Sequence, residues 1–403
     1  MIERLFELSH YYLRTYNRKL KREFLVTPLQ SRISILTGPK GVGKTTALVQ
    51  YLLNVCNNDP FTRKGLYVPV GHTLTARYTL CEIADGFYKE GVKFIIFDDI
   101  HKYHEWPREL KHIQDHYPDL KIFTAACAAL KLHETSHELK RRTVAYHMNT
   151  LSLSEFITFL IDPNIRLKHY TLEEIIYNHE TIAREIRSSL KEKGNNILSL
   201  FNDYLRFGYY PHFIEYRDDL ETFYMKLEQD ARHTVESDFP YIYPDWNGRS
   251  VKNVVKLLSL LTETIPTSID FTDLKKKLEL EDDGRLREYL HFLENSGVVL
   301  SVREKDNDTG IPGSPGRLFL NNPNLVYAME DCTLRSKENI NETFFTAAVT
   351  SFYPLQSIAP GDFLLDHKYA FRVGKNGSEF TAVDEIESGT GKKIPLWLFG
   401  FLC

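Results

Sequence analysis

The sequence predicts an α/β protein that begins with a parallel-sheet domain and continues with helical and mixed α+β parts. Three observations carry this prediction: a glycine-rich turn between a strand and a helix within 33–53, a buried strand that ends in two aspartates at 94–99, and helical periodicity beyond residue 151. A chain of 403 residues is long enough for about two to four domains.

The glycine-rich turn has the spacing G-x-x-x-x-G-K-[ST], between an apolar strand at 33–37 and a helix at 47–53. Its glycines allow backbone N–H groups to surround phosphate oxygens, and the helix N-terminus adds partial positive charge. Lys44 can reach the β- and γ-phosphates, and Thr45 can ligate Mg²⁺. We therefore predict a P-loop that binds ATP with Mg²⁺, the nucleotide being contacted by Gly38, Pro39, Lys40, Gly41, Val42, Gly43, Lys44, Thr45, Thr46 and Asp98.

The second element is the apolar run 94–97, followed by Asp98 and Asp99. Four consecutive apolar residues indicate a parallel strand that is buried on both faces. Acids at its carboxyl end lie where open α/β sheets bind ligands. We predict that Asp98, with Thr45, holds Mg²⁺ and that Asp99 orients and deprotonates the attacking water. For the two acids taken alone, a solvated strand end is the alternative.

Two further strands are expected in the first domain. The strand at 119–124 ends in Thr124, which is predicted to lie near the γ-phosphate. Arg141 and Arg142 precede a final strand at 143–148. Arg142 could contact the γ-phosphate in cis, or in trans across a subunit interface, and a surface arginine is the alternative.

The composition limits the classes of function. The net charge of −4 indicates no globally basic surface for nucleic acid. The five cysteines form no C-x-x-C pair, a pattern that suits a reducing compartment. No apolar run approaches membrane-spanning length, and the N-terminus lacks a signal-peptide core. We predict a cytoplasmic protein.

These motifs together resemble a large family of bacterial and archaeal AAA-superfamily ATPases of mostly unassigned role. The resemblance rests on the P-loop and on residues 97–102, 123–124 and 151–156, and more weakly on residues 203–211, 322–327 and 394–401. It implies an AAA-type P-loop domain with a helical lid, a winged helix and a C-terminal domain of unknown function. It also implies that ATP is hydrolysed to ADP and phosphate.

The chain departs from the family pattern at two places. Asp99 stands where the family usually has glutamate, and Ala125, Ala126 and Cys127 stand where it usually has Gly-Ser-Ser. Aspartate is one methylene shorter, and a misplacement of about 1 Å can cost on the order of a hundredfold in rate. Thr124 is the polar residue that remains as a sensor. The resemblance therefore supports ATP binding more strongly than fast hydrolysis.

We expect four domains on these grounds: a P-loop ATPase domain with a basic N-terminal helix at 1–150, a helical lid at 151–248, a winged-helix-like domain at 249–325, and an α+β domain at 326–403. The third helix of the winged-helix-like domain, at 282–296, carries four acidic residues and two arginines. This charge is unfavourable for DNA, so a structural or protein-interaction role is preferred over DNA binding.

Two patterns suggest other chemistry. Residues 133–137 match H-E-x-x-H, the zinc-peptidase pattern, and Glu155 could supply a third ligand. We expect no metal there or at His112 and His116, because the family resemblance runs through 133–137 without a metal site. A nuclease interpretation is invited by the acids Glu342, Asp362, Glu379, Asp384 and Glu387, but no Glu-x-Lys triplet lies within 379–393.

Three functions remain open from the sequence. The first is an ATPase whose nucleotide state switches the lid and C-terminal domains. The second is a nucleotide-binding interaction module that hydrolyses ATP slowly or not at all. The third is a P-loop enzyme that transfers phosphate to a small acceptor, although no acceptor site is evident. A protein partner or self-association is expected, DNA is weakly supported, and no membrane association is expected.

Overall fold

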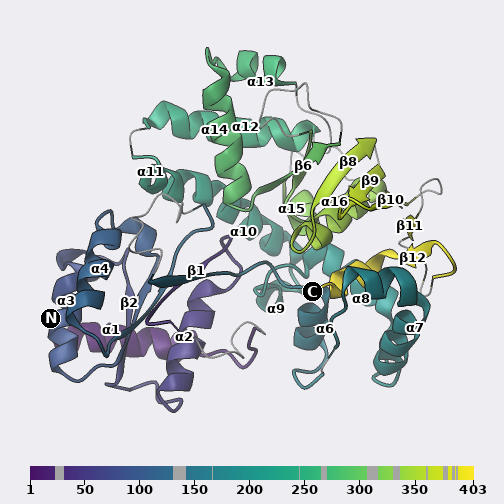
Figure 1. Cartoon of the computed structure of the whole chain (residues 1–403). Helices are drawn as coiled ribbons and strands as arrows, with labels where there is room; N and C mark the ends of the chain where they lie inside the picture. The colour runs from purple at the N-terminus through teal and green to yellow at the C-terminus, as the bar shows by residue number, and fades with distance from the viewer. Residues whose placement is uncertain are drawn as a thin grey trace. The chain divides into compact units, whose positions relative to one another are not determined.

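The computed structural model describes residues 1–22, 31–129, 142–165, 167–244, 246–264, 270–305, 316–329, 336–359, 362–374, 380–383, 386 and 389–403. The chain forms two compact units (Figure 1). The first unit contains Met1–Asn149 and His233–Asn247, and the second contains Thr150–Arg232 and Gly248–Cys403. The first unit is therefore made of two separate stretches of the chain.

The first unit has a five-stranded parallel sheet, as the sequence predicts. Its strand order is β2-β3-β4-β1-β5. The strands are β1 (Ile33–Thr37), β2 (Gly65–Pro69), β3 (Phe94–Asp98), β4 (Lys121–Ala125) and β5 (Thr143–His147). The helices of this part are α1 (Ile2–Thr15), α2 (Lys44–Val55), α3 (Leu80–Lys89) and α4 (Trp106–His116), with short 3-10 turns η2 (Thr75–Arg77) and η3 (Ile100–Lys102). The loop after β1 and the aspartates after β3 consequently lie at the same edge of the sheet.

Helices cover both faces of this sheet. On one face α2 packs through Tyr51, whose ring lies 5.1 Å from that of Phe123 in β4. On the other face, residues of α1, α3 and α4 form a core with the strands. In β3, Ile95, Ile96 and Phe97 are at most 1% exposed. Each such side chain contributes about 1.5–3 kcal/mol, more than the ~1–2 kcal/mol that ordering one backbone residue costs, so the apolar run fixes the strand.

Helix α1 covers the edge strand β2. The hydroxyl of Ser9, a buried residue of α1, accepts a hydrogen bond from the backbone N–H of Tyr67 at 2.9 Å. Phe6 packs edge-on against Phe87 of α3, with ring centroids 4.9 Å apart. The helix therefore satisfies a backbone group that an open sheet edge would expose, and it fixes the position of Tyr67.

A segment returns to the first unit after the chain has entered the second. It contains a π-helical turn, η5 (Thr234–Asp238), and helix α11 (Phe239–Ile242). Phe239 is fully buried, and its ring contacts those of Tyr243 and Trp246. The sequence analysis did not predict this return, because it assigned these residues to the lid and to a linker.

The second unit begins with helices and ends in a mixed sheet. Its helices are α6 (Leu153–Leu160), α7 (Leu172–Lys191), α8 (Ile197–Phe207), α9 (Phe213–Tyr216), α10 (Leu220–His233, whose last residue belongs to the first unit), α12 (Gly248–Thr264), α13 (Phe271–Leu278), α14 (Asp283–Asn295), α15 (Pro323–Ala328) and α16 (Lys337–Thr350). The side chain of Asp270 caps α13. Glu155 belongs to the capping box of α6 with Ser152. Among the described helices, none has both the length and the apolar character needed to span a bilayer.

The sheet of the second unit joins two predicted domains. Its strands are β6 (Val299–Glu304), β7 (Arg317–Leu320), β8 (Leu355–Ala359), β9 (Asp362–Leu365), β10 (Tyr369–Val373), β11 (Phe380–Val383) and β12 (Lys393–Pro395). Their order is β12-β11-β10-β9-β8-β6-β7. The predicted hairpin β6–β7 is antiparallel, and β6 also pairs in parallel with β8, where Arg303 lies opposite Gln356. One continuous sheet therefore crosses the expected boundary at residue 325.

The apolar C-terminus is buried in the second unit. Residues 396–401 form the 3-10 turn η6 (Leu396–Phe401). Trp397 and Phe401 are 0% exposed, and a Cβ atom on Gly400 would lie 2.6 Å from the Cβ of Leu153 in α6. The backbone N–H of Tyr170 donates to the carbonyl oxygen of Phe401 at 2.9 Å. The tail is thus part of the core of the second unit.

Candidate functional site

The loop between β1 and α2 is built as the glycine pattern predicts. A Cβ atom on Gly38 would lie 2.4 Å from the carbonyl oxygen of Met148, so a side chain cannot fit there. Gly43 has a φ of 98°, in the left-handed region, directly before α2. The guanidinium of Arg22 donates to the carbonyl oxygen of Val42 at 2.9 Å and anchors the loop. A turn of this kind before a helix N-terminus is an anion-binding arrangement.

Lys44 is the first residue of α2. Its ammonium donates hydrogen bonds to the carbonyl oxygens of Gly38 and Pro39 at 2.7 and 2.8 Å. Burial lowers the pKa of Lys44, while the carboxylates of Asp99 and Asp98 oppose that shift. A desolvated ammonium at the loop favours an anionic ligand, because phosphate oxygens would compensate its charge.

Asp98 is the last residue of β3 and is 5% exposed. Its Oδ2 accepts hydrogen bonds from the hydroxyl of Thr45, at 2.6 Å, and from the hydroxyl of Tyr67. Its Oδ1 accepts from the backbone N–H of Asp99 at 3.0 Å. Burial raises the pKa of Asp98, and the Asp99 carboxylate raises it further. The oxygens of Thr45 and Asp98 thus lie together beside the loop, and oxygen ligands are those that Mg²⁺ prefers.

Asp99 adopts a left-handed conformation, with a φ of 55°. Aspartate tolerates this region better than most residues. Its Oδ2 accepts a hydrogen bond from the ammonium of Lys102 at 2.6 Å, and its side chain is 44% exposed. Burial alone would raise the pKa of Asp99, but the Lys102 ammonium lowers it below its ordinary value. The carboxylate is therefore ionised at neutral pH and accessible to water.

Thr124 lies within β4 and is fully buried. It is in register with Ile35 and Phe97, which belong to the core formed with α1, α3 and α4. Register neighbours in a sheet point to the same face, so the Thr124 side chain points toward this core. Its hydroxyl has no hydrogen-bond partner within the described residues. The role of Thr124 as a γ-phosphate sensor stays a prediction.

Cys127, two residues beyond β4, is a residue that the site prediction missed. It is 5% exposed, and its backbone N–H donates to Nδ1 of His101 at 3.3 Å. Burial raises the pKa of its thiol, and the carboxylate of Asp238 adds to the increase, whereas the Lys44 ammonium opposes it. The thiol is therefore protonated at neutral pH, and it interacts electrostatically with the ammonium of Lys44 in the P-loop.

His101, Cys127 and Asp238 form a buried cluster in the first unit. One ligand atom from each lies within 4.8 Å of the others, and these atom types are ligands of Zn²⁺. However, Nδ1 of His101 accepts a hydrogen bond, so its ring proton resides on Nε2, which lies 3.3 Å from Oδ1 of Asp238. Both ring nitrogens are engaged, and we interpret the cluster as a hydrogen-bonded chain.

The returning segment is connected to the P-loop at a second point. The ammonium of Lys40, a residue of the loop, lies within hydrogen-bond distance of Nδ1 of His233. With the pair His101–Asp238, this contact ties residues 233–238 both to the loop and to the turn after Asp99. No local sequence pattern indicates either contact, because the partners are 193 and 137 residues apart.

Arg142 lies away from the loop within this chain. It directly precedes β5, at the amino end of the sheet, whereas the P-loop and the aspartates follow the carboxyl ends of β1 and β3. Its guanidinium pairs with the carboxylate of Asp115 in α4. This placement does not support a contact with the γ-phosphate in cis, and the contact in trans stays a prediction.

Several predicted features fall on residues outside the described part of the chain. These are the H-E-x-x-H pattern with His133, Glu134 and His137, the arginine Arg141, and the acids Glu379, Asp384 and Glu387. In α4, Nδ1 of His116 donates a hydrogen bond to the carbonyl oxygen of His112 at 2.9 Å.

Part of the chain matches a known protein family. Residues 30–157 match the AAA domain family. Solved structures with similarity to the chain include C. elegans PCH-2, at 15% identity and a TM-score of 0.24, covering 39% of this chain and 44% of that one. A structure of katanin matches at 17% identity and a TM-score of 0.24, covering 43% and 61%. The RuvB Holliday junction branch migration motor of Thermotoga maritima matches at 13% identity and a TM-score of 0.28, covering 78% and 90%.

The chain therefore spans less than two thirds of the PCH-2 and katanin chains that it matches. No curated protein matches the sequence at a significant level. The family match covers the glycine-rich loop, both aspartates and β4. Residues 30–157 are thus an AAA domain of the P-loop ATPases, which implies ATP binding.

Proposed function

We propose that the protein is a Mg²⁺-dependent ATPase whose nucleotide state is passed from the P-loop to the second unit through residues 233–247. The observation that carries the catalytic part is the hydrogen bond from Thr45 to Asp98, at 2.6 Å, beside a loop in which Gly38 leaves no room for a side chain. The close approach of the backbone in this loop, before a helix N-terminus, suits phosphate binding, and the oxygens of Thr45 and Asp98 are of the type that Mg²⁺ prefers.

Each residue has a definite task in this proposal. The backbone of 38–46 and the Lys44 ammonium bind the phosphates, while Thr45 and Asp98 hold Mg²⁺. When bound, Mg²⁺ neutralises phosphate charge. Asp99, ionised and accessible, orients a water molecule and accepts its proton. Thr124 is proposed as a sensor, and Arg142 as a contact in trans.

The proposed coupling rests on the returning segment. Lys40 contacts His233 directly from the loop, and His101 contacts Asp238 just after the aspartates. Residues 233–247 continue directly into α10 on one side and α12 on the other. A movement of the loop or of the turn at 99–102 would therefore pull on a segment whose two ends both lead into the second unit.

A slow or non-hydrolysing nucleotide-binding module is the alternative. The pair formed by Asp99 and Lys102 favours it, because a carboxylate bonded to an ammonium is a weaker base for the attacking water. The shorter side chain of aspartate acts in the same direction. Under either function we propose a cytoplasmic location, a winged-helix-like role for 249–325 in protein interaction, and a protein partner or self-association. DNA remains weakly supported, because α14 carries more acidic than basic side chains.

The test is release of phosphate from ATP with Mg²⁺, measured for the wild type and for Lys44→Ala and Asp99→Asn. Asparagine also tolerates the left-handed conformation at 99, so this variant removes the base without straining the turn. Turnover that both substitutions abolish supports the ATPase. Binding of ATP that requires Lys44, without turnover in the presence of candidate partners, supports the alternative module.

A further inference from the structure

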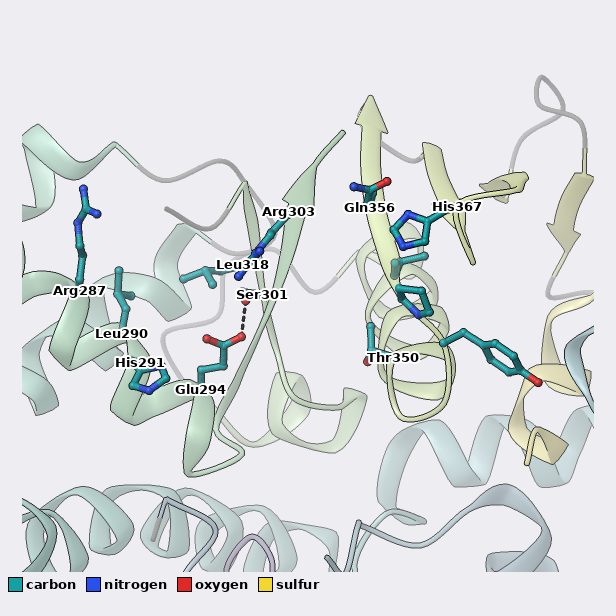
Figure 2. Close-up of a pocket in the computed structure, with 13 residues that line it drawn as sticks. Arg287, Leu290, His291, Glu294, Ser301, Arg303, Leu318, Thr350, Gln356 and His367 are labelled. Atoms are coloured by element: carbon teal, nitrogen blue, oxygen red, sulfur yellow. Dashed lines mark hydrogen bonds between the residues drawn. The ribbon is translucent and has the colours of Figure 1, made fainter. Parts of the chain in front are cut away.

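A second concave site lies wholly within the second unit. It is a cavity of about 500 Å³ between α14 and β6 on one side and the residues around β8 on the other. Figure 2 shows Ser301, Arg303 and Glu294 on one wall, and Gln356, His367 and Thr350 on the opposite wall. Small-molecule sites in proteins typically have ~300–1,000 Å³. The volume is therefore that of a ligand site.

The cavity gathers side chains that can donate hydrogen bonds. Arg303, His291 and His367 all line it, and within the described residues none of the three makes a side-chain hydrogen bond or an ion pair. Arg287 adds a second guanidinium, which lies 5.8 Å from the centre of the Phe271 ring. The side chains of Arg303, His291 and His367 are exposed, so their donors are accessible to the acceptor oxygens of a ligand.

One acid lines the same cavity, and it is already engaged. Glu294 accepts a hydrogen bond from the hydroxyl of Ser301, as Figure 2 shows. The two guanidiniums thus exceed the single carboxylate among the lining residues. A cation is disfavoured in such surroundings, and an anion is favoured.

Three buried leucines also line the cavity. Leu290, Leu318 and Leu355 are 5%, 2% and 8% exposed. Such a surface suits the carbon skeleton or ring of an organic molecule, whereas inorganic phosphate alone would leave it uncovered. The cavity therefore combines an apolar floor with basic donors.

His367 belongs to the hairpin turn between β9 and β10. Asp366 and His367 both have positive φ, 54° and 55°, which is the usual geometry of a type I′ hairpin turn. Here the turn presents the imidazole to the cavity opposite Arg303.

We propose that this cavity binds a small organic phosphate of about the size of a mononucleotide. Arg303 and Arg287 bind the phosphate oxygens, because a guanidinium matches phosphate geometry with paired donors. His291 and His367 add donors, and the three leucines contact the organic part. The site belongs to the second unit alone, so the proposal does not depend on ATP hydrolysis in the first.

Isothermal titration tests this site with two defined probes, uridine 5′-monophosphate and inorganic phosphate. The full chain is first saturated with ADP and Mg²⁺, so that the P-loop is occupied. We expect the uridine nucleotide to bind with a Kd below about 1 mM and inorganic phosphate to bind at least tenfold more weakly. Arg303→Gln and His367→Asn should each weaken binding of the nucleotide about tenfold, which is the effect of losing one charged or well-placed hydrogen bond.

Arg217→Gln serves as the matched control, because Arg217 is an exposed arginine of the same unit that does not line the cavity. It should bind the nucleotide as the wild type does. Asparagine tolerates positive φ at 367, and circular dichroism confirms that the variants are folded. Absence of binding in the wild type, or binding unchanged in both cavity variants, overturns the proposal. Loss of binding in Lys44→Ala with retention in Arg303→Gln overturns it as well, because the P-loop would then be the site.

Discussion

The hydroxyl of Tyr67 donates a hydrogen bond to the same Asp98 oxygen that accepts the hydroxyl of Thr45. Tyr67 belongs to the edge strand β2, and its ring stacks on Tyr12 of α1, with centroids 4.9 Å apart. The N-terminal helix is therefore connected through a single aromatic residue to Thr45 and Asp98, the proposed Mg²⁺ ligands. This relationship means that a change at the sheet edge reaches the Asp98 carboxylate directly.

Tyr67→Phe should move the acid limit of ATP turnover to higher pH. The hydrogen bond from Tyr67 lowers the pKa of Asp98 against the effect of burial, so its loss lets that pKa rise. Hydrogen bonds to charged groups are worth ~1.5–3 kcal/mol, so the shift of the acid limit should be measurable. The measurement is the pH dependence of phosphate release. Tyr12→Phe removes a neighbouring hydroxyl that makes no bond to Asp98, and its pH profile should match that of the wild type.

Asp99→Glu should increase turnover and decrease stability. Glutamate restores the length usual in the family and reaches the attacking water, but it fits the left-handed conformation at 99 less well than aspartate. We expect turnover to rise about tenfold or more and the free energy of unfolding to fall by about 1 kcal/mol. Phosphate release and urea denaturation measure the two effects. A variant that is slower than the wild type would show that Asp99 is already optimally placed.

Lys102→Met should remove a pH-dependent part of the stability. The Lys102 ammonium lowers the folded-state pKa of Asp99, so this pair stabilises the fold above the unfolded pKa of aspartate, near 3.9, and the effect disappears as pH falls through the folded pKa. Both side chains are partly exposed, which limits the effect to at most about 1 kcal/mol at neutral pH. Urea denaturation at several pH values measures it. Lys102→Arg keeps the charge and should retain the profile.

His101→Ala and Asp238→Ala should be energetically coupled. Each removes one side of a buried hydrogen bond, so a double-mutant cycle should give a coupling of about 0.5–3 kcal/mol. In both variants, hydrogen exchange at 234–242 should stop responding to bound nucleotide, although the Lys44-dependent binding of ATP persists. Ser351→Ala, at the exposed end of α16, is a suitable control. A response that survives in both variants would remove residues 233–238 from the proposed coupling.

Trp397→Ala should destabilise the second unit strongly. The side chain is 0% exposed, and its Nε1 donates to the carbonyl oxygen of Ile386 at 3.2 Å. Truncation of a buried tryptophan costs about 3–5 kcal/mol, measured here by urea denaturation. Phe352→Ala, at a side chain that is 51% exposed, should change the free energy of unfolding by less than about 0.5 kcal/mol.

The parts of the site that could be predicted are those encoded locally. A pattern of fewer than ten residues predicts each of two elements. Glycine spacing predicts the loop at 38–46, and a continuous apolar run predicts the strand that leads to Asp98. The helices and hairpin near 254–320 were also predictable, because their periodicity and their cap at Asp270 are local features. The prediction succeeded where short-range sequence decides the conformation.

The residues that the prediction missed are placed by contacts between distant parts of the sequence, or by the alternation of side chains along a strand. Tyr67 reaches Asp98 only because β2 lies beside β3, an order that the sequence does not state. His233 and Asp238 contact the first unit across more than a hundred residues. At β4, alternation of side chains places Thr124 toward the core, while Cys127 lies beyond the strand end beside His101. A polar residue in a strand does not reveal which face it occupies.

The interrupted first unit also has a consequence for biosynthesis. A ribosome releases Met1–Asn149 first, then roughly 80 residues of the second unit, and only afterwards His233–Asn247. At a synthesis rate of ~5–20 residues per second, roughly 4–16 s pass between completion of the sheet and synthesis of the segment that contains Asp238, the partner of His101. During that interval the nascent P-loop domain lacks one of its own buried partners. The order of translation thus delays completion of the nucleotide-binding half until much of the chain has emerged.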